Sequence, residues 1–235
     1  MKKLILVACL GVSLSFSATA AEPNTLSEQE VADGWQLLFN GEDLSGWKTF
    51  NGGEVSGWKV VDGILHNSGV GSDFGGDIST VRQYTDFELS LEWQITPLSN
   101  SGIFIRAREG VADAIYKSGP EYQLSEDAGI QEKRTRNKNQ FTGASYAMYE
   151  AIGGKLNPLG EWNEARILVR GTHVEHWLNG TKVVEYELWS DDWMQRKANS
   201  KWKDEPHYGK AKSGVIGLQD HGGLTMFRNI KIREL

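Results

Sequence analysis

Regular alternation of apolar and polar residues is the pattern that most limits the fold of this chain. It is clearest at residues 87–95, where every second side chain is apolar and those between are polar. Successive side chains of a strand point to opposite faces of a sheet, so this segment predicts a strand with one buried face. Asn179-Gly180 and Asp62-Gly63 each separate two β-prone segments, and both dipeptides favour the tight turn of a β-hairpin.

β-prone segments are spread evenly from residue 35 to residue 234, and no linker divides them. Many short strands with regular turn signals are typical of one β-sandwich or jelly-roll domain. The fold class that we predict is therefore all-β, a single-domain jelly-roll β-sandwich. The expected strands are residues 35–39, 58–61, 64–67, 78–82, 87–95, 102–108, 120–125, 143–150, 163–170, 173–178, 181–187, 214–220 and 225–234.

Helical periodicity is scarce in the sequence. One short helix is predicted at residues 190–200, because Ser190 can cap its N-terminus and two aspartates follow at the positive end of the helix dipole. The polar run 131–140 has no apolar face, so we expect a solvated loop there. A mobile lid beside a site is the alternative for this run.

The N-terminus has the three parts of a secretory signal peptide. Residues 1–3 include two lysines, residues 4–16 are apolar apart from small polar residues, and residues 18–20 form a small-x-small cleavage pattern. We expect export to the periplasm or the medium. A lipoprotein anchored at Cys9 is less favoured, because the apolar stretch before it is very short. The expected divisions are a signal peptide (1–20), a lead-in (21–33) and the jelly-roll domain (34–235).

Composition excludes several classes of function. The chain has 31 acidic and 25 basic residues, a net charge of −6, whereas a nucleic-acid binder needs a clustered basic surface. One cysteine excludes a disulfide framework, and after residue 20 no segment has the apolar length of a membrane span. The 9 tryptophans fit a carbohydrate ligand, since indole rings stack on sugars as well as filling cores. Trp162 and Trp177 are the candidates for such stacking.

The usual sequence motifs of metal sites, nucleophile elbows and phosphate loops are absent. Any chemistry must therefore come from polar side chains on the faces of strands. Amide, guanidinium and carboxylate groups together can bind the hydroxyls of a sugar. The strand segments with unusual polar faces carry Asn100, Arg106, Glu121, Gln123 and Gln219.

Two histidines are candidates for a site. His221 stands between Asp220 and two glycines, and imidazole titrates near neutrality, so we expect it to be an acid or base. The alternative is a histidine that closes a turn. His176 lies on a predicted hairpin strand, where a packed or hydrogen-bonded histidine is the more common role.

Glu88 and Glu92 lie on one face of the strand predicted at 87–95. Jelly-roll glycosidases of the laminarinase type carry three carboxylates, Glu-x-Asp-x-Glu, on one strand. Here Ser90 occupies the central position, so the retaining chemistry of those enzymes is not expected. An ordinary polar strand face is the favoured interpretation.

The motifs together resemble a known family. Residues 34–47 (GWQLLFNGEDLSGW) are similar to the opening of the 3-keto-disaccharide hydrolase domain, long described as a bacterial domain of unknown function. The resemblance continues to residue 234 and so covers nearly the whole predicted mature chain. Further motifs in the family's order are 58–65 (WKVVDGIL), 86–89 (DFEL), 100–106 (NSGIFIR), 121–124 (EYQL), 160–163 (GEWN), 176–180 (HWLNG), 217–222 (GLQDHG) and 227–233 (FRNIKIR).

The resemblance implies a concanavalin A-like, LamG-like jelly roll that acts on glycosides oxidised at C3 by a separate oxidoreductase. A ketone at C3 acidifies the C2 proton, so a base can remove it, the C1 aglycone can leave, and water can then add. This route requires a base, a stabiliser of the developing oxyanion and an acid for the leaving group.

On this hypothesis His221 is the base or acid, and Glu121 is its partner or the second acid/base. Arg106 would stabilise the oxyanion. A divalent metal bound by Glu121, Asp127 or His221 is the alternative electrophile, so a metal cofactor stays open. The residues expected to bind substrate are Gln123, Gln219, Asn100, Asn163, His176 and Trp162.

Three other functions stay open, of which a structural or adhesion domain would show no deep polar pocket. A carbohydrate-binding module without catalysis would use the same sandwich, since a fold does not establish a function. A conventional laminarinase-like glycosidase would instead use Glu88 and Glu92. The expected partners are thus an oxidised glycoside and an upstream sugar 3-oxidoreductase, with neither nucleic acid nor a membrane span.

Overall fold

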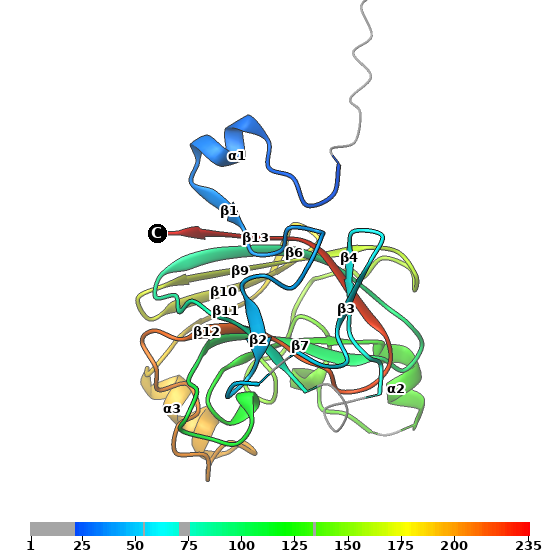
Figure 1. The fold of residues 1–235 in the computed structure, drawn as a ribbon. Coiled ribbons are helices and arrows are strands. Elements are labelled where there is room, and N and C mark those ends of the chain that lie inside the picture. Colours follow the sequence, from blue (N-terminus) through cyan, green and yellow to red (C-terminus); the bar gives the residue numbers. More distant parts are fainter. Residues whose placement is uncertain (1–21, 54, 71–75, 134) are drawn as a thin grey trace, which may run out of the picture.

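A computed structural model describes residues 22–53, 55–70, 76–133 and 135–235. The described chain forms two antiparallel sheets packed face to face (Figure 1), as predicted. The large sheet runs β11 (Thr181–Glu187), β10 (His173–Leu178), β9 (Asn163–Arg170), β6 (Phe87–Ile95), β13 (Thr225–Glu234), β4 (Ile64–His66) and β3 (Lys59–Val61), with β1 (Trp35–Leu37) also paired to β13. The small sheet runs β2 (Trp47–Thr49), β5 (Ile78–Thr80), β12 (Val215–Leu218), β7 (Asn100–Ala107) and β8 (Glu121–Ser125).

The alternating segment at 87–95 forms the central strand β6, which pairs with β9 and β13. Its apolar side chains, including Phe87 and Trp93, are fully buried between the sheets. Both predicted hairpins are confirmed: Asn179-Gly180 joins β10 to β11, and Asp62-Gly63 joins β3 to β4. The φ angles of Asn179 and Gly180 are 47° and 77°, as a type I′ turn requires.

The core between the sheets combines alternate residues of both. From the small sheet, Ile103, Tyr122 and Leu218 face the core, and from the large sheet Ile167 and Phe227 do so. The side chains between them in β7 and β8 consequently point away from the large sheet. This outer face of the small sheet carries Asn100, Glu121, Gln123 and Gln219, four of the five polar residues that the sequence singles out on strand faces.

The structure has more helix than the one element predicted. The helix α3 (Asp191–Ala198) confirms the expectation, and Ser190 accepts a hydrogen bond from the Trp193 backbone as its cap. A lead-in helix, α1 (Glu28–Ala32), and a further helix, α2 (Asp127–Lys133), were not expected. Short 3₁₀ turns lie at Ile115–Lys117 and Lys138–Gln140.

Two local predictions were wrong. The helix α2 takes the first residues of the run expected to be a loop, because Ile130 gives it a buried contact and Glu126 accepts hydrogen bonds from the Gly129 backbone. Residues 143–150 do not form a strand. Met148 and Tyr149 donate to the carbonyl of Ser145 instead, so this segment is a series of turns.

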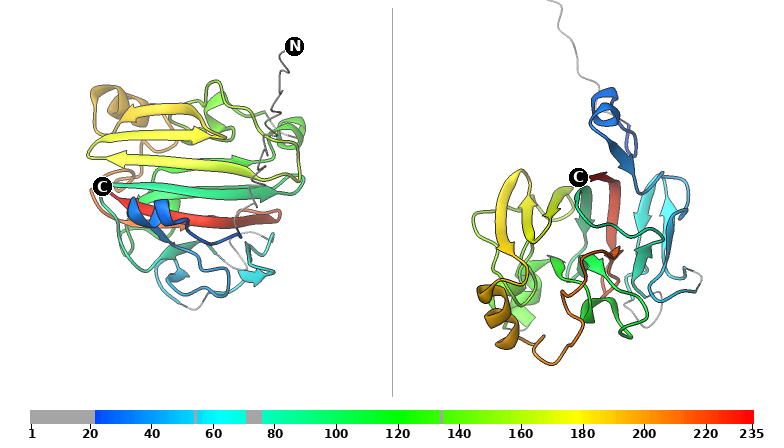
Figure 2. Two further views of the ribbon diagram at one scale, coloured as in Figure 1. Left: turned by 90° about the horizontal axis from the view of Figure 1, so that it is seen from above. Right: turned by 90° about the vertical axis from the view of Figure 1, so that its left-hand side faces the viewer.

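The N-terminal segment is attached to the large sheet. The side chain of Asn24 accepts from the Asn229 backbone at 2.8 Å and donates to the Gly63 carbonyl at 2.7 Å. Figure 2 shows α1 and β1 standing on the outer side of the sandwich beside β13. The predicted signal peptide and Cys9 lie outside the described residues. Within the described residues, no helix is long and apolar enough to cross a membrane.

Candidate active site

A polar cavity of about 290 Å³ opens on the outer face of the small sheet. Its floor comes from β7 and β8, where Gly102 pairs with Gln123, and from the residue after β12, since Gln219 donates its backbone N–H to the Gly102 carbonyl. Three elements far apart in sequence therefore meet side by side. The cavity is lined by Asp77, Asn100, Tyr116, Glu121, Gln123, Tyr146, Lys201, Trp202, Gln219, Asp220 and His221.

Glu121 is a deeply buried carboxyl group of this cavity. It is 4% exposed, and no other described group forms a hydrogen bond with its side chain. Burial raises its pKa to about 8, and the charge of Asp77 adds to that shift while Lys201 opposes it. The Glu121 side chain lies close to the strand at Gly102, where the Cβ of any other residue would overlap it. At neutral pH this group is a carboxylic acid that can give up a proton.

A second carboxyl group, Asp77, lies just before β5 and was missed in the sequence. Burial raises its pKa to about 7, and the neighbouring Asp220 adds to the shift. Asp77 accepts the backbone N–H of Asp220 at 3.1 Å. The Asp220 carboxylate itself accepts from Asn67 at 3.1 Å and from the Ser68 backbone at 3.2 Å. No motif marks Asp77, because its role depends on a contact with a residue 143 positions away.

The side-chain amides of the cavity have defined directions. Gln123 uses its Nε2 to donate to Asn100 Oδ1 at 2.7 Å and to the Leu124 carbonyl at 2.9 Å. Gln123 Oε1 and Asn100 Nδ2 are then left as an acceptor and a donor for a ligand. Gln219 is 5% exposed, and its Oε1 has no hydrogen-bond partner within the described residues. A buried unpaired acceptor is costly, so this atom indicates a position for a ligand hydroxyl.

His221 is exposed at the mouth of the cavity, next to Asp220. The following residue, Gly222, has a φ of 101°, which favours glycine, and its carbonyl accepts the Asn100 backbone N–H at 2.8 Å. This hydrogen bond holds the loop against β7. The structure thus brings Glu121 and His221 to one cavity, together with three of the predicted substrate-binding residues, Asn100, Gln123 and Gln219.

One wall of the cavity is aromatic, and its residues were not predicted from the sequence. Trp202 is buried, donates its indole N–H to the Tyr146 carbonyl at 3.0 Å, and stacks on Tyr208 with 4.5 Å between ring centroids. Tyr116 and Tyr146 flank Trp202 at the cavity surface. These residues come from turns and from the loop after α3, where neither periodicity nor a motif marks them.

Arg106 does not line the cavity, which corrects the expectation for this residue. Its φ of 46° and the shift of register between β7 and β12 mark a β-bulge. Ala107 then takes the outer face beside Phe104, and Arg106 turns inward. The buried guanidinium donates to the carbonyls of Thr85 at 2.7 Å and Gly171 at 2.8 Å, so Arg106 joins loops of the sandwich.

The structure also places His176 away from the cavity. It lies between the sheets, where its Nδ1 is 3.0 Å from the Gly143 carbonyl and its ring is 4.9 Å from that of Tyr122. Burial lowers its pKa to about 4, so it is a neutral core residue. This agrees with the packed role that the sequence favoured over a site.

Asn163 and Trp162 likewise lie elsewhere. Asn163 Oδ1 accepts from the Asn157 backbone at 2.8 Å and from Asn179 at 2.8 Å, which joins the loops at one end of the large sheet. Trp162 is covered by the guanidinium of Arg228, 4.1 Å from its ring centroid. Neither residue is a lining residue of the cavity.

Of the residues proposed for a metal, Glu121 and His221 line the cavity but Asp127 does not. Asp127 begins α2 and accepts hydrogen bonds from Ser125 at 2.5 Å and from the Thr142 backbone at 3.1 Å. Its carboxylate therefore connects loops. Among the described residues, Asp77, Glu121, Asp220 and His221 line the cavity, but no three of them bring ligand atoms within 4.8 Å of one another.

Glu88 and Glu92 both lie on the outer face of the large sheet, where arginines pair with them. Arg166 lies 2.6 Å from Glu88, and Arg233 binds its other oxygen. Arg228 donates to Glu92 at 2.6 Å. Paired charges of this kind support the ordinary polar strand face over a catalytic carboxylate pair.

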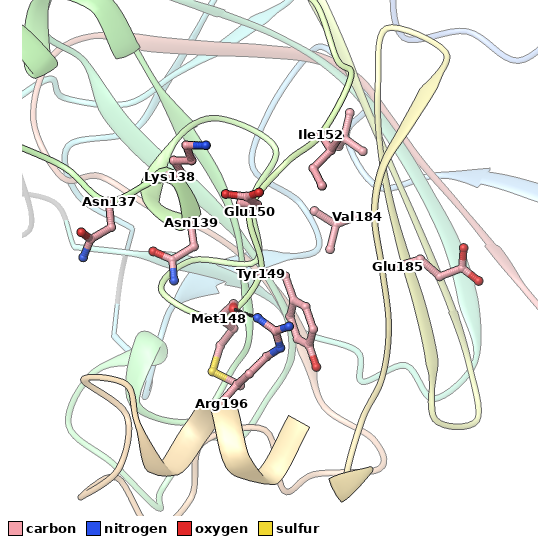
Figure 3. Close-up of a pocket in the computed structure, with 11 residues that line it drawn as sticks. Asn137, Lys138, Asn139, Met148, Tyr149, Glu150, Ile152, Val184, Glu185 and Arg196 are labelled. Carbon is pink, nitrogen blue, oxygen red and sulfur yellow. Dashed lines mark hydrogen bonds between the residues drawn. The ribbon is translucent and has the colours of Figure 1, made fainter. Parts of the chain in front are cut away.

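Two further features lie near β11. An open hollow of about 500 Å³ is lined by residues including Tyr149, Glu150 and Arg196 (Figure 3). Its Arg196 already pairs with Asp192 at 2.9 Å and lies over the ring of Tyr149. The hollow thus has no buried, unpaired acid comparable to Glu121.

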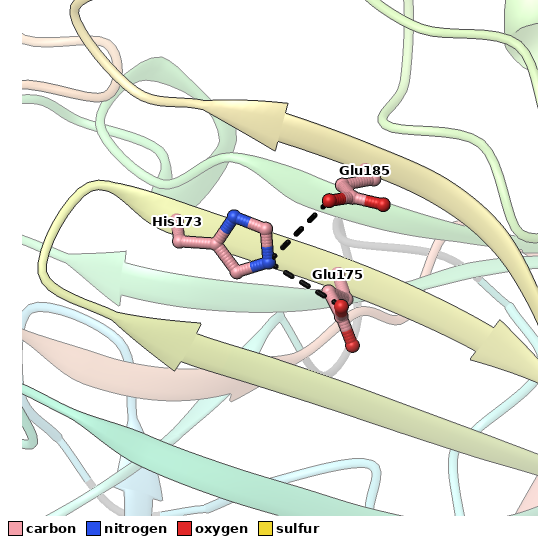
Figure 4. A group of neighbouring side chains, drawn as sticks. All are labelled: His173, Glu175 and Glu185. Carbon is pink, nitrogen blue, oxygen red and sulfur yellow. Dashed lines mark hydrogen bonds and ion pairs between the residues drawn. The ribbon is translucent and has the colours of Figure 1, made fainter.

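A histidine–glutamate cluster lies across β10 and β11 (Figure 4). His173 Nε2 is 3.3 Å from Glu175 and 3.8 Å from Glu185, and the three residues could offer ligand atoms within 4.8 Å of one another. Lys182 Nζ binds both glutamates, at 3.1 Å in the case of Glu175. The lysine therefore neutralises the charge that would attract a cation.

Comparison with known proteins identifies relatives of this chain. Residues 34–233 match the model of the 3-keto-alpha-glucoside-1,2-lyase-like domain. A 3-keto-disaccharide hydrolase of Bacteroides thetaiotaomicron is 33% identical over 252 residues, covering 96% of this chain and 87% of that protein. A crystal structure of a protein assigned as a glycosyl hydrolase, from Parabacteroides distasonis, is 41% identical with a TM-score of 0.84, covering 91% of this chain and 100% of the other.

More distant structures confirm the fold alone. The carbohydrate-binding module CBM66 of Bacillus subtilis is 14% identical with a TM-score of 0.50, covering 80% of this chain and 96% of that chain. A protein of the same species with a galectin-like fold gives the same identity and TM-score, covering 91% of this chain and 94% of that chain. The family model covers most of the chain, and so does the curated relative. The chain therefore belongs to the 3-keto-alpha-glucoside-1,2-lyase-like domain family.

Proposed function

We propose that the protein cleaves 3-keto-glycosides by elimination followed by hydration. The observation that carries the proposal is the cavity that pairs a buried neutral acid, Glu121, with a histidine at its mouth, His221. A neutral acid and an imidazole that can act as a base are the two groups that a proton-transfer elimination needs. Membership of the family and the name of the Bacteroides relative support the same reaction class.

The reaction begins at the carbon beside the ketone. His221 removes the C2 proton, and the electron pair moves into an enediolate whose charge lies on the C3 oxygen. The enediolate then expels the C1 oxygen with its bonding electrons, and Glu121 protonates that oxygen as it leaves. Water adds across the resulting double bond, with hydroxyl to C1 and hydrogen to C2, so the sum is hydrolysis. Neither step requires a carboxylate pair of the glycosidase type.

The remaining polar groups of the cavity fit a sugar ring. Gln123 Oε1 and Gln219 Oε1 are acceptors suited to hydroxyl protons, and Asn100 Nδ2 is a donor suited to a hydroxyl oxygen. Tyr116 offers a ring beside them, which suits the C–H face of a pyranose. We assign the stacking role to this tyrosine in place of Trp162 and Trp177.

The substrate has a chemical prerequisite, since ordinary glycosides carry a hydroxyl at C3. An oxidoreductase acting at C3 must therefore supply the ketone. The signal-peptide pattern of residues 1–20 supports export, so we place the reaction outside the cytoplasm.

A matched pair of substrates tests the proposal. The protein is incubated with a 3-keto-glucoside and with the same glucoside unoxidised, each with and without a chelator, and aglycone release is followed. Release from the ketone alone is expected. Binding of the unoxidised sugar with no release from either would identify a binding module and overturn the proposal. Release from the unoxidised glucoside at an equal rate would identify a conventional glycosidase.

A variant pair connects the activity to the cavity. The His221→Ala variant is expected to lose at least about 100-fold in turnover of the ketone, within the usual contribution of a general base. His207→Ala is the matched control, since that histidine does not line the cavity. Near-normal turnover by His221→Ala would show that His221 is not the base.

A further inference from the structure

Elimination from a 3-keto-sugar places negative charge on the C3 oxygen, and a group must stabilise it. Arg106, the cation expected from the sequence, is engaged between loops of the sandwich. The cavity contains another cation, Lys201, from the loop that follows α3. Apart from His221, Lys201 is the one basic side chain among the described residues that line it.

The ammonium group of Lys201 is held by ring faces. Its Nζ lies 4.5 Å from the ring centroid of Tyr146 and 4.3 Å from that of Trp202. Trp202 is itself fixed by its hydrogen bond to Tyr146 and its stack on Tyr208. A cation over two rings is attracted by their quadrupoles, while its N–H donors stay free for an acceptor. The aromatic wall thus holds Lys201 at the cavity without accepting hydrogen bonds from its ammonium group.

No protein oxygen within the described residues accepts a hydrogen bond from Lys201 or forms an ion pair with it. Lys197, in the last turn of α3, behaves differently: its Nζ donates to the Glu205 carbonyl at 2.9 Å and to that of Tyr208 at 3.3 Å. The carboxyl group whose charge acts on Lys201 is Glu121, which burial keeps neutral near pH 7. A free ammonium beside a neutral acid is suited to an oxyanion that forms during the reaction.

We propose that Lys201 binds the C3 carbonyl oxygen of the substrate and stabilises the enediolate. The role deepens the proposed function and rests on it. Removal of one oxyanion donor typically lowers turnover about 10²–10³-fold, because the donor acts in a preorganised site. The same contact favours a ketone over an alcohol, since an alcohol develops no charge at that position.

The test uses Lys201→Met, which keeps the length of the side chain and removes its charge. Lys203→Met is the matched control from the same loop, because Lys203 is exposed and lies outside the cavity. Two rates are measured: aglycone release from the 3-keto-glucoside, and exchange of its C2 proton for deuterium in D₂O. We expect Lys201→Met to lower both by about 100-fold, with little change in affinity for the unoxidised glucoside, and Lys203→Met to change neither.

A chemical rescue separates charge from packing. Lys201→Cys is made in a Cys9→Ser background, so that the new thiol is the one cysteine of the chain. Alkylation with 2-bromoethylamine restores an ammonium of nearly lysine length, whereas iodoacetamide adds a neutral amide. Restored turnover with the first reagent alone supports the role.

The outcomes distinguish the two proposals. If the wild-type protein releases aglycone from the ketone and Lys201→Met retains that rate, the role of Lys201 is wrong and the function stands. Equal recovery with both alkylating reagents would also overturn it, because packing alone would then suffice. If the wild-type protein releases nothing from the ketone, the proposed function fails, and the role of Lys201 fails with it.

Discussion

Gly102→Ala is expected to reduce activity by displacing the acid Glu121. An alanine Cβ at this position would lie 2.8 Å from Cγ and 2.9 Å from Cδ of Glu121, against 3.4–4 Å for an ordinary contact. The carboxyl group must therefore move by roughly 0.5–1 Å. A displacement of about 1 Å in a catalytic group costs about 10²-fold in rate, or about 2.7 kcal/mol of transition-state stabilisation. The strand backbone itself accepts alanine, since Gly102 lies within β7.

The assay compares turnover and thermal stability. Overpacking costs about 1–3 kcal/mol, so Gly102→Ala should also lower the Tm by several degrees. Gly217→Ala is the matched control: it lies on the neighbouring strand, and its Cβ would overlap Ile115 and not Glu121. We expect the control to lose comparable stability and much less activity.

A double-mutant cycle identifies the cause. If Gly102→Ala acts through Glu121, it costs almost nothing further when added to Glu121→Gln, because the displaced group is already inactive. Turnover of Gly102→Ala within threefold of wild type would refute the reasoning. An additive loss in the double variant would show that Gly102 acts through another group.

Three further predictions follow from the same geometry. Because the Glu121 pKa is about 8, the rate should fall as the pH rises through about 8. The unfolded chain ionises this group from about pH 4.5, whereas the folded chain keeps it protonated up to about pH 8, so it destabilises the fold increasingly over this range. The Tm of Glu121→Gln should therefore rise relative to that of the wild type as the pH rises from about 4.5 to 8. Arg106→Met should lower the free energy of unfolding by about 2 kcal/mol or more in denaturant titrations, since it removes the hydrogen bonds of a buried guanidinium to Thr85 and Gly171 and its ion pair with Asp86, while turnover per folded molecule stays near normal. Glu88→Gln should leave turnover of the ketone within about twofold, as its carboxylate only pairs with surface arginines; a loss of 100-fold would restore the glycosidase alternative.

Much of the sandwich could be predicted because each strand carries its own two-residue period. The segment at 87–95 and the two hairpins needed no tertiary information, since alternation and Asn-Gly or Asp-Gly turns are local signals. The segment at 143–150 failed for the opposite reason. Its composition is β-prone, but hydrogen bonds to Ser145 and the positive φ of Ala147 turn the chain instead.

The residues that form the floor of the cavity could also be predicted from the sequence. Glu121 and Gln123 share a face by alternation, and their strand follows that of Asn100, so the three could be placed together from pattern alone. The same rule placed Arg106 on that face and failed. A bulge adds one residue to a strand and so reverses the face to which every later side chain points, and no local sequence pattern indicates it.

The sequence by itself determined most of the strands, the family and the polar face on which the cavity opens, because these depend on residues close together in the chain. Only the tertiary structure decided which groups complete the cavity. Asp77 joins the cavity through its contact with Asp220, and Lys201 joins it through contacts with aromatic rings from separate segments. Burial, which makes Glu121 an acid with a pKa of about 8, likewise exists only once the sheets and loops have packed.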